Sequence, residues 1–193
     1  MQDSPTAAAE AASATFRAWS ALGPNARRSL LNRAAEELEA RTDAFIEAME
    51  DELHASEPWA RFNVMLGAAM VREAAAMTTQ ITGEVIPSDK PGLLSLALRE
   101  PVGVVLGIAP WNAPVILGCR AIAAPLACGN TVILKASERC PRTHGMIVEA
   151  FATAACSVPQ GNPPGSLREA LTHLRSGQQQ SSTTAKRLAE VLS

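Results

Sequence analysis

Three polar side chains follow two apolar runs of the sequence, at the points where buried strands are expected to end. Asn112 follows the run 102–109, and Lys135 follows the run 131–134, with Glu138 three residues further on. An amide can donate hydrogen bonds to a ligand oxygen, and a lysine beside a carboxylate can bind the hydroxyl groups of one ligand. Because open α/β sheets bind ligands outside the carboxyl ends of their strands, we expect the three side chains at one such edge.

The two apolar runs do not alternate polar with apolar residues, which is typical of parallel strands buried on both faces. Between them, residues 113–128 are about the length of a crossover helix, so the sequence predicts a right-handed strand–helix–strand unit, half of a nucleotide-binding fold. Taken alone, Asn112 could be a helix cap and Lys135 a solvated surface charge. Their places at the ends of two successive strands favour the functional interpretation.

Four short motifs occur in order within this unit: Pro101-Val102-Gly103-Val104, Pro110-Trp111-Asn112-Ala113-Pro114, Gly129-Asn130-Thr131-Val132 and Lys135-Ala136-Ser137-Glu138. With these motifs the chain resembles the N-terminal part of an aldehyde dehydrogenase of the NAD-dependent superfamily. The surrounding residues are most similar to the branch that acts on aromatic aldehydes, such as the salicylaldehyde and vanillin dehydrogenases. The resemblance extends from about Thr15 to about Ala154.

The resemblance implies a role for each polar side chain. Asn112 would donate its amide to the oxyanion that forms when a thiolate attacks an aldehyde, and Lys135 and Glu138 would bind the adenosine ribose hydroxyls of the cofactor. A carboxylate repels a 2′-phosphate, so Glu138 indicates NAD rather than NADP. The complete set of residues that the resemblance assigns to the cofactor is Ile108, Trp111, Lys135, Ser137 and Glu138.

The expected fold is α/β, a partial Rossmann-like parallel sheet with an N-terminal helical layer and a hairpin arm. We expect four segments: the helical layer over 1–82, the arm over 83–100, the first half of the NAD-binding domain over 101–156, and a divergent, poorly ordered tail over 157–193. In the family the arm pairs between subunits, which implies oligomerisation through 83–100. A surface hairpin packed on its own domain is the alternative.

Helical periodicity dominates the first 82 residues. The first helix is expected over 5–22, and a second continues at least to Leu38. A third is expected to begin at Thr42 or Asp43, and either residue could cap it. A further helix opens at Glu57-Pro58. Its expected buried face consists of Phe62, Leu66, Met70, Met77 and Ile81. The resemblance implies that these helices form the family's outer helical layer, which covers the nucleotide-binding sheet.

The tail departs from the family pattern. A break rich in proline and glycine after Cys156 has no strand pattern, and residues 166–175 have helical spacing through Leu167, Leu171 and Leu174. The family's cysteine nucleophile and glutamate base should lie beyond Ser193. We therefore expect a truncated chain with no turnover of its own, and a shifted reading frame or mis-joined exon would explain the tail.

Composition excludes several other classes of function. The net charge is −2 and lysine and arginine do not cluster, so neither nucleic acid nor an anionic membrane is an expected partner. No apolar run reaches the roughly 18–20 residues of a membrane span. The four cysteines lack metal-ligand spacing, and an N-terminus without a signal peptide favours reduced thiols in the cytoplasm.

Two hypotheses from different classes follow. The chain belongs to an oxidoreductase that oxidises an aldehyde, aromatic in this branch, to the carboxylic acid with NAD and no metal. Alternatively, it is a non-catalytic fragment or interaction module that acts only on a partner. A general helical module would account for the first hundred residues but not for the motifs around Asn112 and Lys135.

Overall fold

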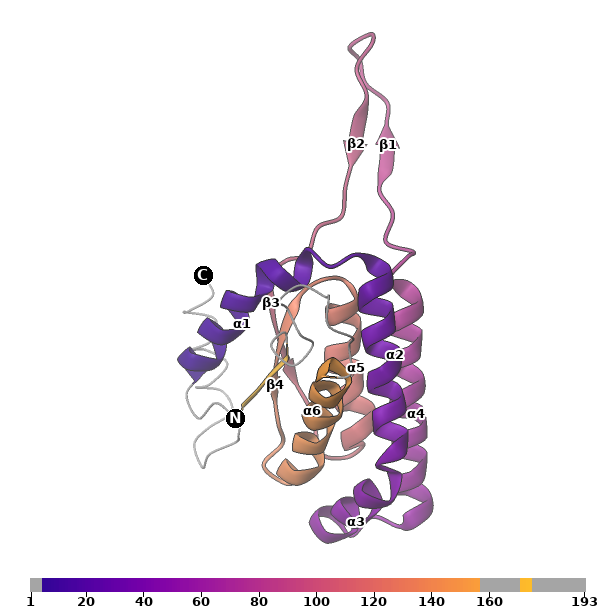
Figure 1. The fold of residues 1–193 in the computed structure, drawn as a ribbon, viewed down its shortest axis with the longest axis vertical. Helices are drawn as coiled ribbons and strands as arrows, with labels where there is room; N and C mark the ends of the chain where they lie inside the picture. The colour runs from indigo at the N-terminus through magenta and orange to yellow at the C-terminus, as the bar shows by residue number, and fades with distance from the viewer. Residues whose placement is uncertain (1–4, 157–170, 175–193) are drawn as a thin grey trace.

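The computed structural model describes residues 5–156 and 171–174, and Figure 1 shows their arrangement. The described helices are α1 (Pro5–Ser20), α2 (Pro24–Ala40), α3 (Thr42–Leu53), α4 (Glu57–Met77), α5 (Pro114–Ala127) and α6 (Pro141–Cys156). The described strands are β1 (Glu84–Ile86), β2 (Ser95–Ala97), β3 (Val104–Ile108), β4 (Thr131–Lys135) and β5 (Leu171–Leu174). Apart from β5, the predicted tail over 157–193 lies outside the described residues.

Strands β3, β4 and β5 form a parallel sheet in that order. The two strands expected from the apolar runs are therefore present, joined by α5 as the crossover helix. Their register runs from Val104 opposite Thr131 to Ile108 opposite Lys135. All five residues of β4 are buried, as expected for a central strand covered on both faces.

The third strand corrects the helix expected over 166–175. Leu171–Leu174 instead pairs with β4, from Val132 opposite Leu171 to Lys135 opposite Leu174. The free edge of β4 offers a row of unpaired backbone N–H and C=O groups, and pairing satisfies them. Three leucines span too short a segment for periodicity alone to distinguish a helix from a strand.

The described helices cover both faces of the sheet, one helix on one face and two layers on the other. On one face, Ala8, Ala9 and Ala12 of α1 pack against Ile133 of β4. On the other face lie α5 and α6, and α2 and α4 pack mainly on the outside of these two helices (Figure 1). The expected outer helical layer is therefore present in α2 and α4, which α5 and α6 separate from the sheet.

The buried face of α4 is not the one expected. Phe62, Met77 and Ile81 are exposed by 41%, 42% and 37%, and Leu66 and Met70 are only partly buried. The buried residues are mostly small: Ala60, Asn63, Val64, Gly67, Ala68, Val71, Ala74 and Ala75. Small side chains let α4 approach its neighbours closely, which a pattern of bulky apolar residues cannot reveal.

Helix α3 starts without the predicted side-chain cap. Arg41 occupies the N-cap position, and no side chain caps the helix. The Thr42 hydroxyl instead donates back to the carbonyl oxygen of Glu39 in α2, at 2.6 Å. Neither Thr42 nor Asp43 is therefore a cap, because the chain passes from α2 to α3 with only one residue between them.

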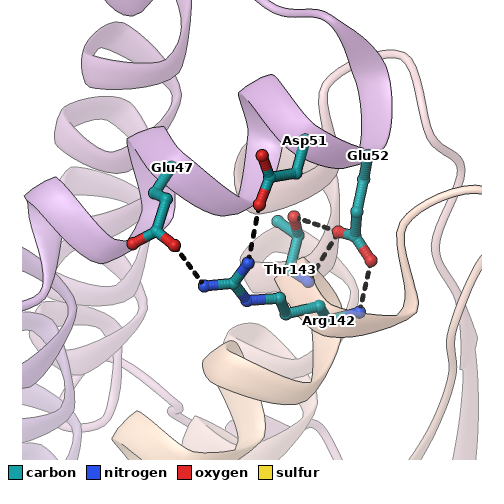
Figure 2. A network of polar contacts seen from close by, with 5 residues as sticks. All are labelled: Glu47, Asp51, Glu52, Arg142 and Thr143. Atoms are coloured by element: carbon teal, nitrogen blue, oxygen red, sulfur yellow. Dashed lines mark hydrogen bonds and ion pairs between the residues drawn. The ribbon is translucent and has the colours of Figure 1, made fainter.

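A carboxylate on α3 caps the first turn of α6 (Figure 2). Glu52 accepts hydrogen bonds from the backbone N–H groups of Arg142 and Thr143, at 2.7 and 2.9 Å, and from the Thr143 hydroxyl at 2.7 Å. The Arg142 guanidinium donates to Asp51 and Glu47, at 2.9 and 3.1 Å. The negative charge satisfies N–H groups that have no partner within the helix and complements the helix dipole.

The hairpin of β1 and β2 projects away from the helices and the parallel sheet (Figure 1). Its apolar side chains face solvent: Val85, Leu94 and Leu98 are exposed by 71%, 73% and 71%. The alternative of a hairpin packed on its own domain is therefore wrong.

Candidate functional site

The carboxyl ends of β3 and β4 lie side by side. Ile108 is in register with Lys135, and the backbone N–H of Ala109 donates to the carbonyl oxygen of Lys135 at 3.1 Å. The segments that leave these strands, residues 110–113 and 136–140, therefore begin at the same edge of the sheet. This is the edge at which open α/β folds bind ligands.

Lys135 and Glu138 are brought together at this edge. The Lys135 ammonium donates to the carbonyl oxygen of Ala136 at 3.2 Å and lies 3.4 Å from the Glu138 carboxylate. The Lys135 side chain is 9% exposed, whereas that of Glu138 is 59% exposed. The strand end thus holds a nearly buried cation beside an accessible carboxylate, a donor and an acceptor that two neighbouring hydroxyl groups could use.

A cation–π contact links the two segments beyond the strands. The Arg139 guanidinium lies 4.1 Å from the centroid of the Trp111 ring. Trp111 and Ile108 are 46% and 55% exposed at this edge, so their apolar surfaces remain available to a ligand. Arg139 was not anticipated from the sequence, although its position directly after Glu138 could have suggested it.

Asn112 lies in the bend between β3 and α5 and is exposed. The N-cap position of α5 is held by Ala113, with no side-chain hydrogen bond to the helix. The alternative that Asn112 caps the helix is therefore wrong. Among the described residues its amide has no hydrogen-bond partner, so it is available as a donor at this edge.

Ser137 is turned partly inward. Its hydroxyl accepts a hydrogen bond from the backbone N–H of Arg139 at 3.3 Å, and its own N–H donates to Nδ1 of His144 at 3.0 Å. His144 is fully buried in the first turn of α6. Sequence reasoning missed this histidine, because nothing in its spacing connects it to the motif that precedes α6.

Two buried cysteines, Cys119 within α5 and Cys140 just before α6, are poor nucleophiles. Burial raises the pKa of the Cys119 thiol to about 12 and that of the Cys140 thiol to about 11. Since the thiolate is the reactive form, both thiols stay protonated near neutral pH. Within the described part of the chain, no group of three or more His, Cys, Asp or Glu side chains could hold a metal ion.

A family model described as "Aldehyde dehydrogenase family" matches residues 2–172. The chain belongs to the aldehyde dehydrogenase family. The family resemblance expected from the four motifs is thereby confirmed, with its N-terminal position. Among the helices that the structure describes, none combines the length and the apolar character needed to cross a membrane.

Aldehyde dehydrogenases of aromatic substrates are among the relatives of this chain. A vanillin dehydrogenase of Pseudomonas fluorescens is 62% identical over 148 residues, which are 77% of this chain and 30% of that protein. A benzaldehyde dehydrogenase [NAD(+)] of Pseudomonas putida is 35% identical over 156 residues, 80% of this chain and 32% of that protein. The chain therefore spans about a third of the length of these curated relatives.

A solved aldehyde dehydrogenase confirms the fold class. The crystal structure of a salicylaldehyde dehydrogenase from Pseudomonas putida G7, complexed with salicylaldehyde, is 42% identical in sequence and superposes with a TM-score of 0.82. The match covers 95% of this chain and 35% of that one. The partial Rossmann-like sheet, the helical layer and the hairpin are thus parts of an aldehyde dehydrogenase fold.

Proposed function

We propose that this chain supplies the adenosine-binding edge and the oxyanion donor of an enzyme that oxidises an aromatic aldehyde to the carboxylic acid with NAD. The observation that carries this proposal is the Lys135–Glu138 pair at the carboxyl end of a parallel strand, 3.4 Å apart beside the exposed Ile108 and Trp111. The names of the vanillin and benzaldehyde dehydrogenase relatives support an aromatic aldehyde as the substrate.

The residues at this edge fit a dinucleotide. Glu138 is exposed and can accept hydrogen bonds from ribose hydroxyls, while Lys135 can donate to them from a fixed position at the strand end. The Glu138 charge would repel a 2′-phosphate, which favours NAD over NADP. When bound, NAD accepts the hydride that the aldehyde carbon loses on oxidation.

Asn112 is proposed as a catalytic residue. Its exposed amide follows β3 and would donate to the aldehyde oxygen as negative charge develops there. A fixed donor of this kind typically lowers a barrier by about 3–4 kcal/mol. Neither Cys119 nor Cys140 fits the nucleophile, since their raised pKa values keep them protonated, and we propose that the chain alone does not turn over.

A second candidate function is a non-catalytic module that binds a partner. The exposed apolar side chains of the hairpin favour it, with Val85, Leu94 and Leu98 all more than two-thirds in solvent. We propose a second subunit as that partner, bound through residues 83–100.

The cysteines whose side chains are described are all free, which supports a reducing cytoplasm as the location.

Calorimetric titration of the purified chain with NAD and NADP tests the main proposal. We expect NAD to bind more tightly than NADP, and Glu138→Gln to narrow the difference because a neutral amide no longer repels the 2′-phosphate. Glu50→Gln, at an exposed position on α3, is the matched control. Failure of the wild-type chain to bind NAD would overturn the proposed site, and equal binding of both dinucleotides would overturn the role of Glu138.

Incubation with vanillin or salicylaldehyde and NAD, read together with the NAD titration, separates the two candidate functions. We expect no NADH from this chain alone. Sustained turnover would contradict the proposal that the chain lacks its own nucleophile, and turnover that survives Asn112→Ala would also contradict the oxyanion assignment. NAD binding without turnover is the result that a half-site predicts.

A further inference from the structure

One buried imidazole holds the turn that carries the Lys135–Glu138 pair. Ser137 lies between these two residues, and its backbone N–H donates to Nδ1 of His144 at 3.0 Å. His144 is 0% exposed, so this N–H finds its partner inside the protein rather than in water. The Cys140 sulfur lies 3.7 Å from the same ring nitrogen and closes the far end of the turn.

The other hydrogen bonds of the turn are local. The Arg139 N–H donates to the Ser137 hydroxyl at 3.3 Å, and the Cys140 N–H donates to the Ser137 carbonyl oxygen at 3.4 Å. These bonds shape the turn but do not tie it to the helix. Two hydrogen bonds of His144, a residue of α6, tie the turn to the helix: its backbone N–H donates to the carbonyl oxygen of Cys140 at 3.2 Å, and its ring accepts from Ser137 in the middle of the turn.

The position of the ring is itself fixed by packing. The ring packs against Gly118 of α5, where a Cβ would lie at an ordinary contact distance of 3.4 Å from Cδ2 of His144 but only 2.6 Å from Cδ1 of Ile147 in the next turn of α6. The start of α6 is anchored to α3 through Glu52, which binds the N–H groups of Arg142 and Thr143. The acceptor nitrogen thus has a defined place relative to the sheet edge.

The contact also determines the tautomer of the ring. A nitrogen that accepts from an N–H carries no proton, so a neutral His144 has its proton on Nε2. A side chain that lacks an acceptor at the Nδ1 position would leave the partly buried Ser137 N–H without this partner. An N–H without a hydrogen-bond partner raises the free energy of the folded state, and the turn is expected to rearrange to relieve that cost.

We propose that His144 is a positioning residue of the nucleotide edge: its Nδ1 holds the Ser137 N–H so that Lys135 and Glu138 face the same ribose. The proposal rests on the proposed function of that edge. His144 itself touches neither the cofactor nor the substrate, and it acts through the backbone of the turn.

A pair of isosteric variants isolates the acceptor. In His144→Asn the amide oxygen can take the place of Nδ1, whereas in His144→Gln the longer side chain puts its amide near the place of Nε2. Both lose the ring, so a difference between them reports the acceptor. We expect NAD affinity within about threefold of wild type for the asparagine variant and a loss of about tenfold for the glutamine variant.

Thermal unfolding of each variant checks that it folds. The matched control is His54→Asn, because His54 is exposed at the C-cap of α3 and has a left-handed backbone conformation that asparagine tolerates. Equal NAD affinity for wild type and the glutamine variant would overturn the proposal while leaving the proposed function intact. Equal losses in both variants would also overturn it, because ring packing and not the acceptor would then matter.

Nuclear magnetic resonance supplies a readout that needs no cofactor. We expect ring-nitrogen shifts of the Nε2–H tautomer for His144, and a downfield Ser137 amide proton that persists in the asparagine variant and moves in the glutamine variant. The Glu138 amide should move with it. An Nδ1–H tautomer, or an unchanged Ser137 amide in the glutamine variant, would overturn the proposal. Absence of NAD binding by the wild type would instead overturn the proposed function.

Discussion

Lys135 illustrates how a charge can stand at a strand end with little exposure. Its ammonium has a backbone carbonyl and the Glu138 carboxylate within hydrogen-bonding reach, at 3.2 and 3.4 Å, so the cost of removing it from water is offset. Because Glu138 is well exposed, the pair itself adds little to stability. Its value lies in presenting a donor and an acceptor at one edge of the sheet.

The buried thiols predict how stability depends on alkaline pH. Burial raises the pKa of Cys119 to about 12 and that of Cys140 to about 11, from an ordinary value of 9.0. Above about pH 9 the unfolded chain loses thiol protons that the folded chain keeps, so the free energy of unfolding falls as pH rises toward the folded-state values. The slope is at most about 1.4 kcal/mol per pH unit for each thiol.

Urea unfolding at about pH 8 and about pH 10.5 measures this slope. Cys119→Ala is less stable at both pH values, because it loses packing, and should have a shallower dependence on pH. An identical dependence in the variant and the wild type would show that Cys119 is not protected from ionisation in the folded protein.

At the scale of elements, the contact between α4 and α5 depends on the absence of a side chain at Gly67. A Cβ built there would lie 3.0 Å from Cγ1 and 3.3 Å from the carbonyl oxygen of Val115. Gly67→Leu should therefore destabilise the fold by about 3 kcal/mol or more, since the helices must separate. Ala69→Leu, at an exposed position of the same helix, should change stability by less than about 0.5 kcal/mol.

Urea titrations of the two leucine variants compare these positions directly. A Gly67→Leu protein as stable as wild type would mean that α4 and α5 can move apart without cost. That result would contradict the close packing of small residues as the reason why the bulky face of α4 points outward.

The capping of α6 by Glu52 makes a second prediction at this scale. Glu52→Gln removes the negative charge that three donors at the start of α6 face, but it keeps an oxygen that can accept a hydrogen bond. We therefore expect the free energy of unfolding to fall by about 1–2 kcal/mol. Glu50→Gln, exposed on the same helix, should have almost no effect. Thermal unfolding of both proteins at low and high salt tests this, and equal stabilities would contradict the cap.

The elements themselves were predictable to different degrees. The apolar runs around β3 and β4 give strands because continuous burial leaves few alternatives. The buried face of α4 was mispredicted because, where two helices approach closely, the small side chains are buried and the bulky ones are exposed. Strand β5 was missed because its pairing depends on the free edge of β4, which is remote in sequence.

At the scale of the whole molecule, the hairpin is the part that projects from the helices and the parallel sheet (Figure 1). An isolated two-stranded hairpin is marginal in water, and its apolar side chains point outward. If a second subunit covers it, sedimentation velocity should give a species larger than the monomer. Substitution of both Leu94 and Leu98 by lysine should then produce the monomer, because two desolvated charges oppose association.

Ser88→Lys, at the exposed tip between the strands, is the control for added charge. Its sedimentation should match that of the wild type. A wild-type chain that sediments as a monomer at all concentrations would contradict the proposed subunit contact through residues 83–100.

The sequence by itself determined the parallel strands, the crossover helix and the family, because these depend on local apolar runs and on motifs at fixed spacing. The tertiary structure alone decided which side chains meet. It placed Arg139 over Trp111 and set the His144 ring against the Ser137 N–H. Such contacts depend on how helices and strands pack in three dimensions, and the order of residues along a chain does not encode that geometry in any short pattern.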